Sequence, residues 1–277
     1  NSHVVKRIED VGFLRSIQFA EDAGPLSHPV RPDSYIEISN FYTPTIYEKG
    51  AEIVRMYNTM LGEEKFRQAT DLYFDRHDGT AATTDDFALT MEEVGGVDLT
   101  QFKRWYQQAG TPMLTISESF QGGILRLEVE QSCPSTPGQL VKKPFHIPVE
   151  LGLINSDGQP SLLDSLDIFS EAKHELLKNG QSLLFHLKSE KTKIELGNFN
   201  TKPVVSFLRE FTAPVKVDYS RPLSELVYLA GLDTDGFVRW DSLQSLWVEY
   251  FKTDGELQGV DAVDSIGAIA KDLLEES

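Results

Sequence analysis

The tripeptide Gly110-Thr111-Pro112 separates two parts of the chain whose apolar residues recur with different periods. Before it, apolar residues recur every three to four positions, which is typical of amphipathic helices. After it, they alternate with polar residues, which is typical of strands with one solvated face. Gly commonly ends a helix and Pro cannot continue one, so a domain boundary is predicted here. Because the helical period returns near residue 220, the sequence predicts an α+β multidomain chain with domains 1–111, 112–218 and 219–277.

The periods also predict the individual elements. In the first domain we expect helices near 3–20, 44–61, 63–76, 84–94 and 99–108. In the second, strands are expected at 113–120, 124–130, 145–154, 182–187, 193–196 and 204–217, which is the spacing of a small β-sandwich. In the third, three apolar stripes predict helices: Leu223, Leu226, Val227 and Ala230; Phe237, Trp240, Leu243, Leu246 and Trp247; and a last group between 263 and 274.

The expected helix at 44–61 is well defined at both ends. Thr43 is a suitable N-cap, Pro44 suits the first helical position, and Gly62 is placed to end the helix. Ile46, Gly50, Ile53, Tyr57 and Leu61 follow the helical period and should face the core. Tyr47 stands just off this stripe, so its hydroxyl could point into a cleft beside the core, although a half-buried structural tyrosine fits the same pattern.

Several blocks of the sequence resemble one enzyme family. They are QFAEDAGPLSHPVRPDSYIE at 18–37, NFYTPTIYEKGAEIVRM at 40–56, LYFDRHDGTAATTDDF at 72–87, DLTQFKRWYQQAGTP at 98–112 and LREFTAPVKVDY at 208–219. In this order and spacing the chain resembles the aminopeptidase N family of zinc-dependent metallo-aminopeptidases, in particular its bacterial alanyl-aminopeptidase branch. The resemblance is thinner after residue 220.

The resemblance implies roles for three residues. In the family, the tyrosine of a segment like TIYEKG, here Tyr47, donates its hydroxyl to the oxyanion that forms when zinc-bound water attacks the scissile carbonyl. Such a fixed donor stabilises the transition state more than the ground state. Tyr42 resembles a residue that lines the pocket for the first side chain of the substrate, although it would equally fix the loop to the helix. Glu48 could face the same cleft, or could simply suit the positive end of the helix dipole.

The zinc ligands of the family are missing from this sequence. A zincin carries H-E-x-x-H on a helix, and no two of the six histidines are four residues apart. His174-Glu175 copies only the first half of the motif, because Lys178 stands where the second histidine belongs. The family's third ligand and its G-x-M-E-N motif would precede residue 1, so zinc is expected in the intact parent protein and none bound to this chain.

The resemblance and the chain ends together predict a piece of a larger enzyme. It would comprise the helical second half of a thermolysin-like catalytic domain, a β-sandwich, and the start of a C-terminal helical domain. Helical patterns begin almost at residue 1 and continue to the last residues, so the rest of the parent chain is expected to cover exposed apolar surface. The isolated chain is predicted to be inactive. A non-catalytic binding or scaffolding module of the same superfamily is the alternative.

The composition limits the kinds of binding partner that this chain can have. The net charge of −17 and the sequence pI of about 4.7 argue against nucleic acid, which requires clustered Lys and Arg. No apolar run is long enough to span a membrane. The single cysteine, Cys133, excludes internal disulfides, and no histidine lies near it in the sequence to activate it. The family resemblance implies peptide substrates, and because no signal peptide is visible a cytoplasmic location is expected.

Overall fold

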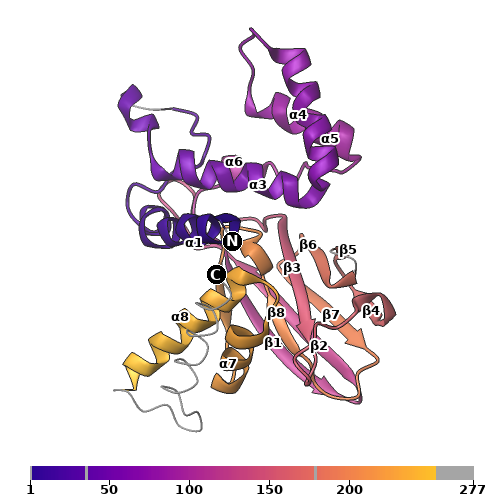
Figure 1. Ribbon diagram of the computed structural model, residues 1–277. Helices are drawn as coiled ribbons and strands as arrows, with labels where there is room; N and C mark the ends of the chain where they lie inside the picture. The colour runs from indigo at the N-terminus through magenta and orange to yellow at the C-terminus, as the bar shows by residue number, and fades with distance from the viewer. Residues whose placement is uncertain (1, 35–36, 178–179, 254–277) are drawn as a thin grey trace.

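The chain is arranged as a helical part, a β-sandwich beneath it, and a pair of helices beside the sandwich (Figure 1). The structure is a computed structural model that describes residues 2–34, 37–177 and 180–253. The order of elements is helices, then strands, then helices, which confirms the predicted fold class.

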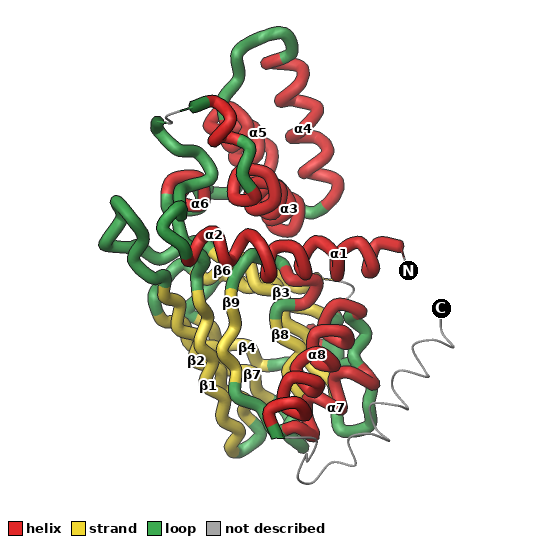
Figure 2. The backbone as a smooth tube through the Cα atoms, turned by 90° about the vertical axis from the view of Figure 1, so that its left-hand side faces the viewer, coloured by secondary structure: helices red, strands yellow, loops and turns green. Residues whose placement is uncertain are grey.

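The helical part contains the first nine elements. They are α1 (Ser2–Phe13), η1 (Leu14–Gln18), α2 (Phe19–Ala23), η2 (Ile38–Phe41), η3 (Thr45–Lys49), α3 (Gly50–Leu61), α4 (Glu63–His77), α5 (Thr84–Gly95) and α6 (Arg104–Gln107). Elements α1 to α2 form one rod that runs between α3 and the ends of the strands (Figure 2). Gly62, with φ of 76°, ends α3 as predicted.

The helix predicted at 99–108 is wrong in extent, because only Arg104–Gln107 is an α-helix. The preceding residues form short turns, in which Arg104 N donates to Gln101 O and Trp105 N to Phe102 O. Trp105 is fully buried, and its indole N–H donates to the carbonyl of His146 at 2.8 Å. This contact with the sandwich fixes the conformation of the segment. A continuous helix over 99–108 would direct the Trp105 indole away from the His146 carbonyl.

The sandwich consists of two sheets. Its strands are β1 (Met113–Gln121), β2 (Ile124–Ser132), β3 (Ile147–Ile154), β4 (Asp167–Ser170), β5 (Lys173–Leu177), β6 (Ser182–Leu187), β7 (Lys191–Gly197), β8 (Val204–Phe207) and β9 (Lys216–Tyr219). One sheet has the order β4-β7-β2-β1-β9 and the other β5-β6-β3-β8. Strand β9 pairs with β1 in parallel, and the other pairs are antiparallel.

The strand predicted at 204–217 is wrong, because a turn at 209–211 (η6) divides it into β8 and β9. Leu208, Glu210 and Phe211 have φ of 57°, 55° and 52°, the left-handed region that L-residues rarely adopt. This backbone turns the Arg209 side chain inward, onto Gly152 of β3. A Cβ at Gly152 would lie 2.2 Å from the Arg209 guanidinium carbon, so only glycine leaves room for it.

The last helices, α7 (Leu223–Leu232) and α8 (Gly236–Lys252), pack on each other beside β8 (Figure 2). The Asp235 carboxylate accepts from Val238 N at 2.9 Å and so caps α8. Of the two predicted stripes, Ala230 and Leu246 are fully buried, whereas Trp247 remains 37% exposed. The third stripe, between 263 and 274, lies outside the described residues.

The helical part and the sandwich share one continuous hydrophobic core. Apolar surface is left at the far end of α8, where Val248 and Phe251 are 50% and 71% exposed. Of the helices that the structure describes, none is long and apolar enough to cross a bilayer.

Candidate functional site

Tyr47 lies in η3, a π-helical turn that leads into α3. The Thr43 hydroxyl accepts from Ile46 N at 3.2 Å, and Tyr47 N donates to Thr43 O at 3.1 Å, so Thr43 caps the turn as predicted. The helix begins at residue 44 as predicted, but its first turn is π-helical rather than α-helical. Such turns are rare and occur frequently at functional sites.

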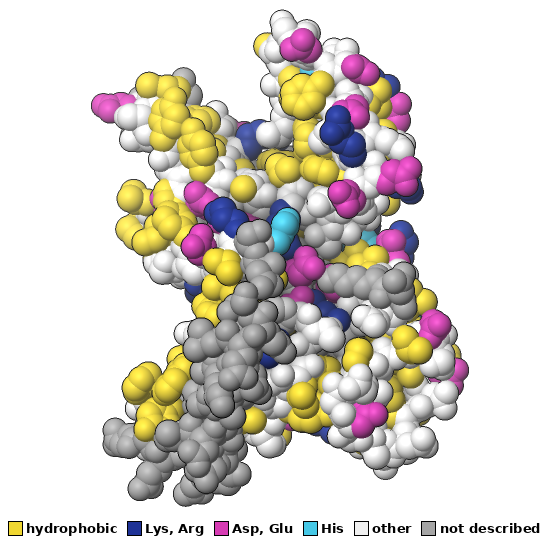
Figure 3. Space-filling view, viewed as in Figure 1, with side chains coloured by type: hydrophobic (Ala, Val, Ile, Leu, Met, Phe, Trp, Pro, Cys, Tyr) yellow, Lys and Arg dark blue, Asp and Glu magenta, His cyan; other side chains and the backbone are white. Residues whose placement is uncertain are grey.

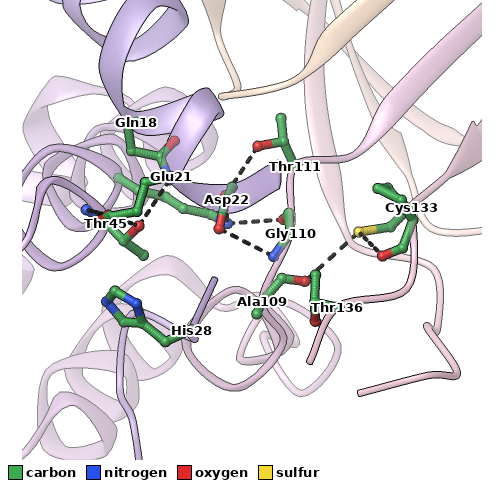
Figure 4. Close-up of polar contacts among 12 residues, drawn as sticks. Gln18, Glu21, Asp22, His28, Thr45, Ala109, Gly110, Thr111, Cys133 and Thr136 are labelled. Carbon is green, nitrogen blue, oxygen red and sulfur yellow. Dashed lines mark hydrogen bonds and ion pairs between the residues drawn. The ribbon is translucent and has the colours of Figure 1, made fainter. Parts of the chain in front are cut away.

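Acidic and amide side chains of η1 and α2 hold the turn from behind. The Glu21 carboxylate accepts from both Thr45 N at 2.9 Å and the Thr45 hydroxyl at 2.5 Å, and the Gln18 amide donates to that hydroxyl at 3.2 Å (Figure 4). His28 Nε2 lies 2.9 Å from the Thr43 hydroxyl. These bonds fix both the residue that caps the turn and the residue that starts it.

A buried ion pair holds the end of the same turn. Lys49 Nζ lies 2.8 Å from Asp22 Oδ2, and the two side chains are 1% and 0% exposed. Lys49 also donates to Gly110 O at 2.9 Å, while the Thr111 hydroxyl and Gly110 N donate to the Asp22 carboxylate at 3.0 and 3.3 Å (Figure 4). The pair therefore ties α2 and η3 to the segment at 110–111 that enters the sandwich.

The electrostatics of this pair are dominated by two opposing effects. Burial by itself raises the pKa of Asp22, but the Lys49 ammonium, with hydrogen bonds from Lys49, Gln18 and Thr111, outweighs it, so that the pKa of Asp22 lies below its usual value. The carboxylate is therefore ionised at neutral pH and its charge is balanced inside the protein. A buried pair of this kind is strongly destabilised when one partner is removed.

In front of this anchored turn, Tyr47 and Tyr42 form an exposed aromatic pair. Their ring centroids are 6.1 Å apart with an interplanar angle of 20°, and their side chains are 57% and 68% exposed. Within the described residues, the Tyr47 hydroxyl makes no hydrogen bond. Glu48, beside Tyr47 in the chain, is half-buried. The structure thus brings together two of the three residues singled out in the sequence, Tyr42 and Tyr47, and leaves the side chain of Tyr47 largely exposed.

A notch divides the helical part. In the space-filling view it separates the projection that carries η2 from the pair α4–α5, and hydrophobic side chains gather on that projection (Figure 3). Ile38 in η2 is 62% exposed, as is much of Tyr42 just after it. An exposed apolar surface of this kind is typical of an interaction site.

The residues present do not fit a zinc ion. Among the residues that the structure describes, no group of three His, Cys, Asp or Glu side chains could hold a metal. His174 and Glu175 lie in strand β5 rather than on a helix, so their side chains point to opposite faces of the sheet. Cys133 is half-buried, and burial raises the pKa of its thiol, which disfavours the nucleophilic thiolate.

The residues behind the turn were not predicted from the sequence. Glu21 and Asp22 stand in a block that carried the family resemblance, but they were given no role. Lys49 offered a signal, because it is three residues after Ile46 and four before Ile53, which places it on the buried face of the helix. A lysine at such a position requires a buried carboxylate partner.

Two protein families match consecutive parts of this chain. Residues 9–106 match the family described as the peptidase family M1 domain, and residues 110–220 match a domain of unknown function (DUF3458) with an Ig-like fold. The chain therefore carries part of a peptidase family M1 domain joined to an Ig-like domain. The boundary between the two matches falls close to Gly110-Thr111-Pro112.

Within this class the chain is similar to bacterial aminopeptidase N, which confirms the resemblance seen in the sequence. It is 42% identical over 253 residues to the aminopeptidase N of Escherichia coli K12, covering 91% of this chain and 28% of the relative. It is 45% identical over 244 residues to that of Caulobacter vibrioides, covering 87% of this chain and 26% of the relative.

A solved structure shows the same fold. The crystal structure of Legionella pneumophila aminopeptidase A superposes with a TM-score of 0.70 and 24% sequence identity, over 90% of this chain and 26% of that one. The chain thus spans little more than a quarter of the length of the proteins it matches.

Proposed function

We propose that this chain works as part of a zinc-dependent aminopeptidase that removes N-terminal residues from peptides, and that Tyr47 donates its hydroxyl to the scissile carbonyl oxygen as negative charge develops there. Similarity to bacterial aminopeptidase N over most of the chain supports the reaction class. The observation that carries the role of Tyr47 is its accessible, unengaged hydroxyl on a turn anchored by buried side chains.

The anchoring matters for the chemistry. A hydrogen-bond donor stabilises a transition state most when it is already oriented, because no reorganisation is then needed as charge develops. Thr45 lies two residues before Tyr47 and is held by the half-buried Glu21, and Lys49 lies two residues after it and is held by the buried Asp22. The backbone of Tyr47 is therefore fixed while its ring remains free to meet a substrate.

Tyr42 and Glu48 would form part of the substrate pocket in this proposal. The Tyr42 ring lies against Tyr47 and presents an apolar face to the first side chain of a peptide. The described residues contain no set of zinc ligands, so this chain's own contribution is to bind the peptide and to stabilise the oxyanion.

The test is Tyr47→Phe in the complete protein that contains this chain, with hydrolysis of L-alanine p-nitroanilide as the assay. We expect kcat to fall by roughly 10²–10³ with little change in KM, as for the loss of one oxyanion donor. Tyr73→Phe is the matched control, since Tyr73 packs against Phe74, His77 and Phe87 and has no place in the proposal. Unchanged kcat in Tyr47→Phe would contradict the role.

The 277-residue chain by itself should not hydrolyse this substrate, with or without added zinc. Chelator-sensitive hydrolysis by the purified chain would show that it holds a metal of its own. A complete protein that binds peptides but never cleaves them would instead support a non-catalytic binding module.

A further inference from the structure

Thr43 holds the turn that carries Tyr47 through two hydrogen bonds of its own. Its hydroxyl accepts from Ile46 N at 3.2 Å, and its carbonyl accepts from the backbone N–H of Tyr47 itself at 3.1 Å. Thr43 lies in neither a helix nor a strand. Whatever holds its side chain from outside therefore also fixes the start of the turn and the backbone of Tyr47.

His28 holds the Thr43 hydroxyl from the loop that follows α2. His28 Nε2 lies 2.9 Å from this hydroxyl, and His28 Nδ1 lies 2.8 Å from Leu26 O. Both polar atoms of the imidazole are thus engaged, and the ring is fixed between a backbone carbonyl and the cap of the turn. Within the described part of the chain, no other side chain bonds to the Thr43 hydroxyl.

The Leu26 carbonyl determines the direction of the bond to Thr43. A carbonyl oxygen can only accept, so His28 Nδ1 carries the ring proton, and Nε2 of the neutral imidazole is an acceptor. The Thr43 hydroxyl therefore donates to His28 Nε2 and keeps its lone pairs for Ile46 N. Without this partner the hydroxyl is free to rotate, and it then caps the turn in more than one orientation.

The loop that carries His28 is itself attached to the rest of the helical part. Arg31 N, three residues further along, donates to Tyr106 O at 2.9 Å. Val30 is buried against the start of α3, where a Cβ added at Gly50 would lie 3.6 Å from a Val30 methyl carbon. His28 is therefore part of a fixed loop, so its bond to the cap of the turn is a bond to the body of the protein.

We infer that His28 is a positioning residue for Tyr47, which it holds through the Thr43 hydroxyl in the orientation that aims the phenol at a substrate carbonyl. The inference rests on the donor role proposed above for Tyr47. Because both ring nitrogens of His28 are already bonded, the ring has none left for a metal ion or for a proton of the substrate. His28 thus acts on the reaction through the turn and not by contact with the reacting atoms.

The kinetic test uses the complete protein that contains this chain, with L-alanine p-nitroanilide as substrate. His28→Leu should lower kcat at least about tenfold and leave KM near its original value, because a small displacement of an oriented donor is costly. His28→Gln keeps an acceptor near the position of Nε2 and should restore most of the loss. Unchanged kcat in His28→Leu, or no recovery in His28→Gln, would overturn the inference. His174→Leu is the matched control, since that ring packs on Phe185 in the sandwich, and its kcat should stay unchanged.

The same substitution in a Tyr47→Phe background separates this inference from the role of Tyr47. If His28 acts through the phenol, His28→Leu should change kcat by less than about twofold once the hydroxyl is gone. A second loss of the same size would show that His28 acts independently of Tyr47, which overturns the inference. If Tyr47→Phe alone leaves kcat unchanged, the proposed role of Tyr47 fails instead, and amide exchange still decides whether His28 holds the turn.

Hydrogen exchange of the complete protein, followed by mass spectrometry of its peptides, tests the positioning without turnover. Exchange in segment 43–49 should be faster in His28→Leu than in the wild type, whereas segment 53–61 of α3 should exchange as before. Equal exchange of segment 43–49 in the two proteins would mean that His28 does not hold the turn. If His28→Leu does not fold, Thr43→Val removes the same hydrogen bond from the other side and replaces it in the kinetic and exchange measurements.

Discussion

Two of the buried polar clusters in the described part of the chain differ in how they end. Around Asp22 and Lys49, the carboxylate and the ammonium meet each other and the backbone of the segment at 110–111, so the network is closed. The hydrogen-bonded chain of side chains from Glu175 through His186 stops at His146 Nδ1, beside a cavity. A closed network fixes geometry, whereas an open one leaves a buried polar atom unsatisfied, which is costly. The first cluster supports the site proposed around Tyr47, whereas the second ends on a buried nitrogen without a hydrogen-bond partner among the described residues.

The largest expected effect comes from breaking the closed network. Asp22→Ala leaves the Lys49 ammonium buried without its counter-charge, and we expect about 3–5 kcal/mol of lost unfolding free energy. Equilibrium unfolding in urea measures this. Asp71→Ala is the control, because Asp71 pairs with Arg67 on an exposed helix face and should cost about 0–1 kcal/mol. Similar costs for the two variants would show that the Asp22 network does not hold the turn.

Lowering the pH should affect the stability contributions of the two clusters differently. The folded pKa of Asp22 lies below its unfolded value of 3.8, so its contribution to stability is present above that pH and is lost only on further acidification. The pKa of His146 falls from 6.5 to about 3 on folding, so the unfolded chain binds the extra proton. Stability should therefore decline from about pH 6.5 downward, by about 1.4 kcal/mol per pH unit for this one group.

The measurement is the free energy of unfolding between pH 6.5 and pH 4. His146→Phe should flatten the decline in this window, whereas Asp22→Asn should leave its slope unchanged. Burial also lowers the pKa of His186, which therefore adds to the slope in the same direction. An unaltered slope in His146→Phe would mean that His146 is not the buried neutral group described above.

A smaller effect should follow from loosening the turn without removing a charge. Thr45→Val loses the hydroxyl that donates to Glu21 but keeps the backbone bond, at a cost of about 1–2 kcal/mol. In the complete protein, kcat for peptide hydrolysis should fall while KM stays near its original value, since Thr45 orients Tyr47 and does not contact substrate. Thr59→Val is the control, because that hydroxyl bonds only to its own helix at Arg55 O. A change in KM alone would argue for a substrate contact instead.

The sequence predicted the long helices and the first hairpin of the sandwich, because their residues repeat with a clear period. It missed β4 and β5, which are short and whose burial alternates only weakly. It also read 204–217 as one strand, since nothing local announces that Leu208, Glu210 and Phe211 take positive φ. The buried Arg209 guanidinium holds that turn: it donates to the Ser206 hydroxyl nearby in the chain and to the Asp233 carboxylate at the end of α7, and the sequence gives no sign of the second contact.

The same division holds for the candidate site. The cap at Thr43 was predictable from the sequence, because helix capping depends on neighbours within a few residues. Tyr47 was singled out only by the family resemblance. The π-helical form of the turn, the pairing of Lys49 with Asp22, and the relay that ends at His146 depend on groups 27 to 61 residues apart or on different sheet strands. The sequence by itself thus determined the local elements and the class of protein. Only the tertiary structure decided which polar groups are satisfied and which remain open, because burial turns an ordinary charge or lone pair into one that must find a partner.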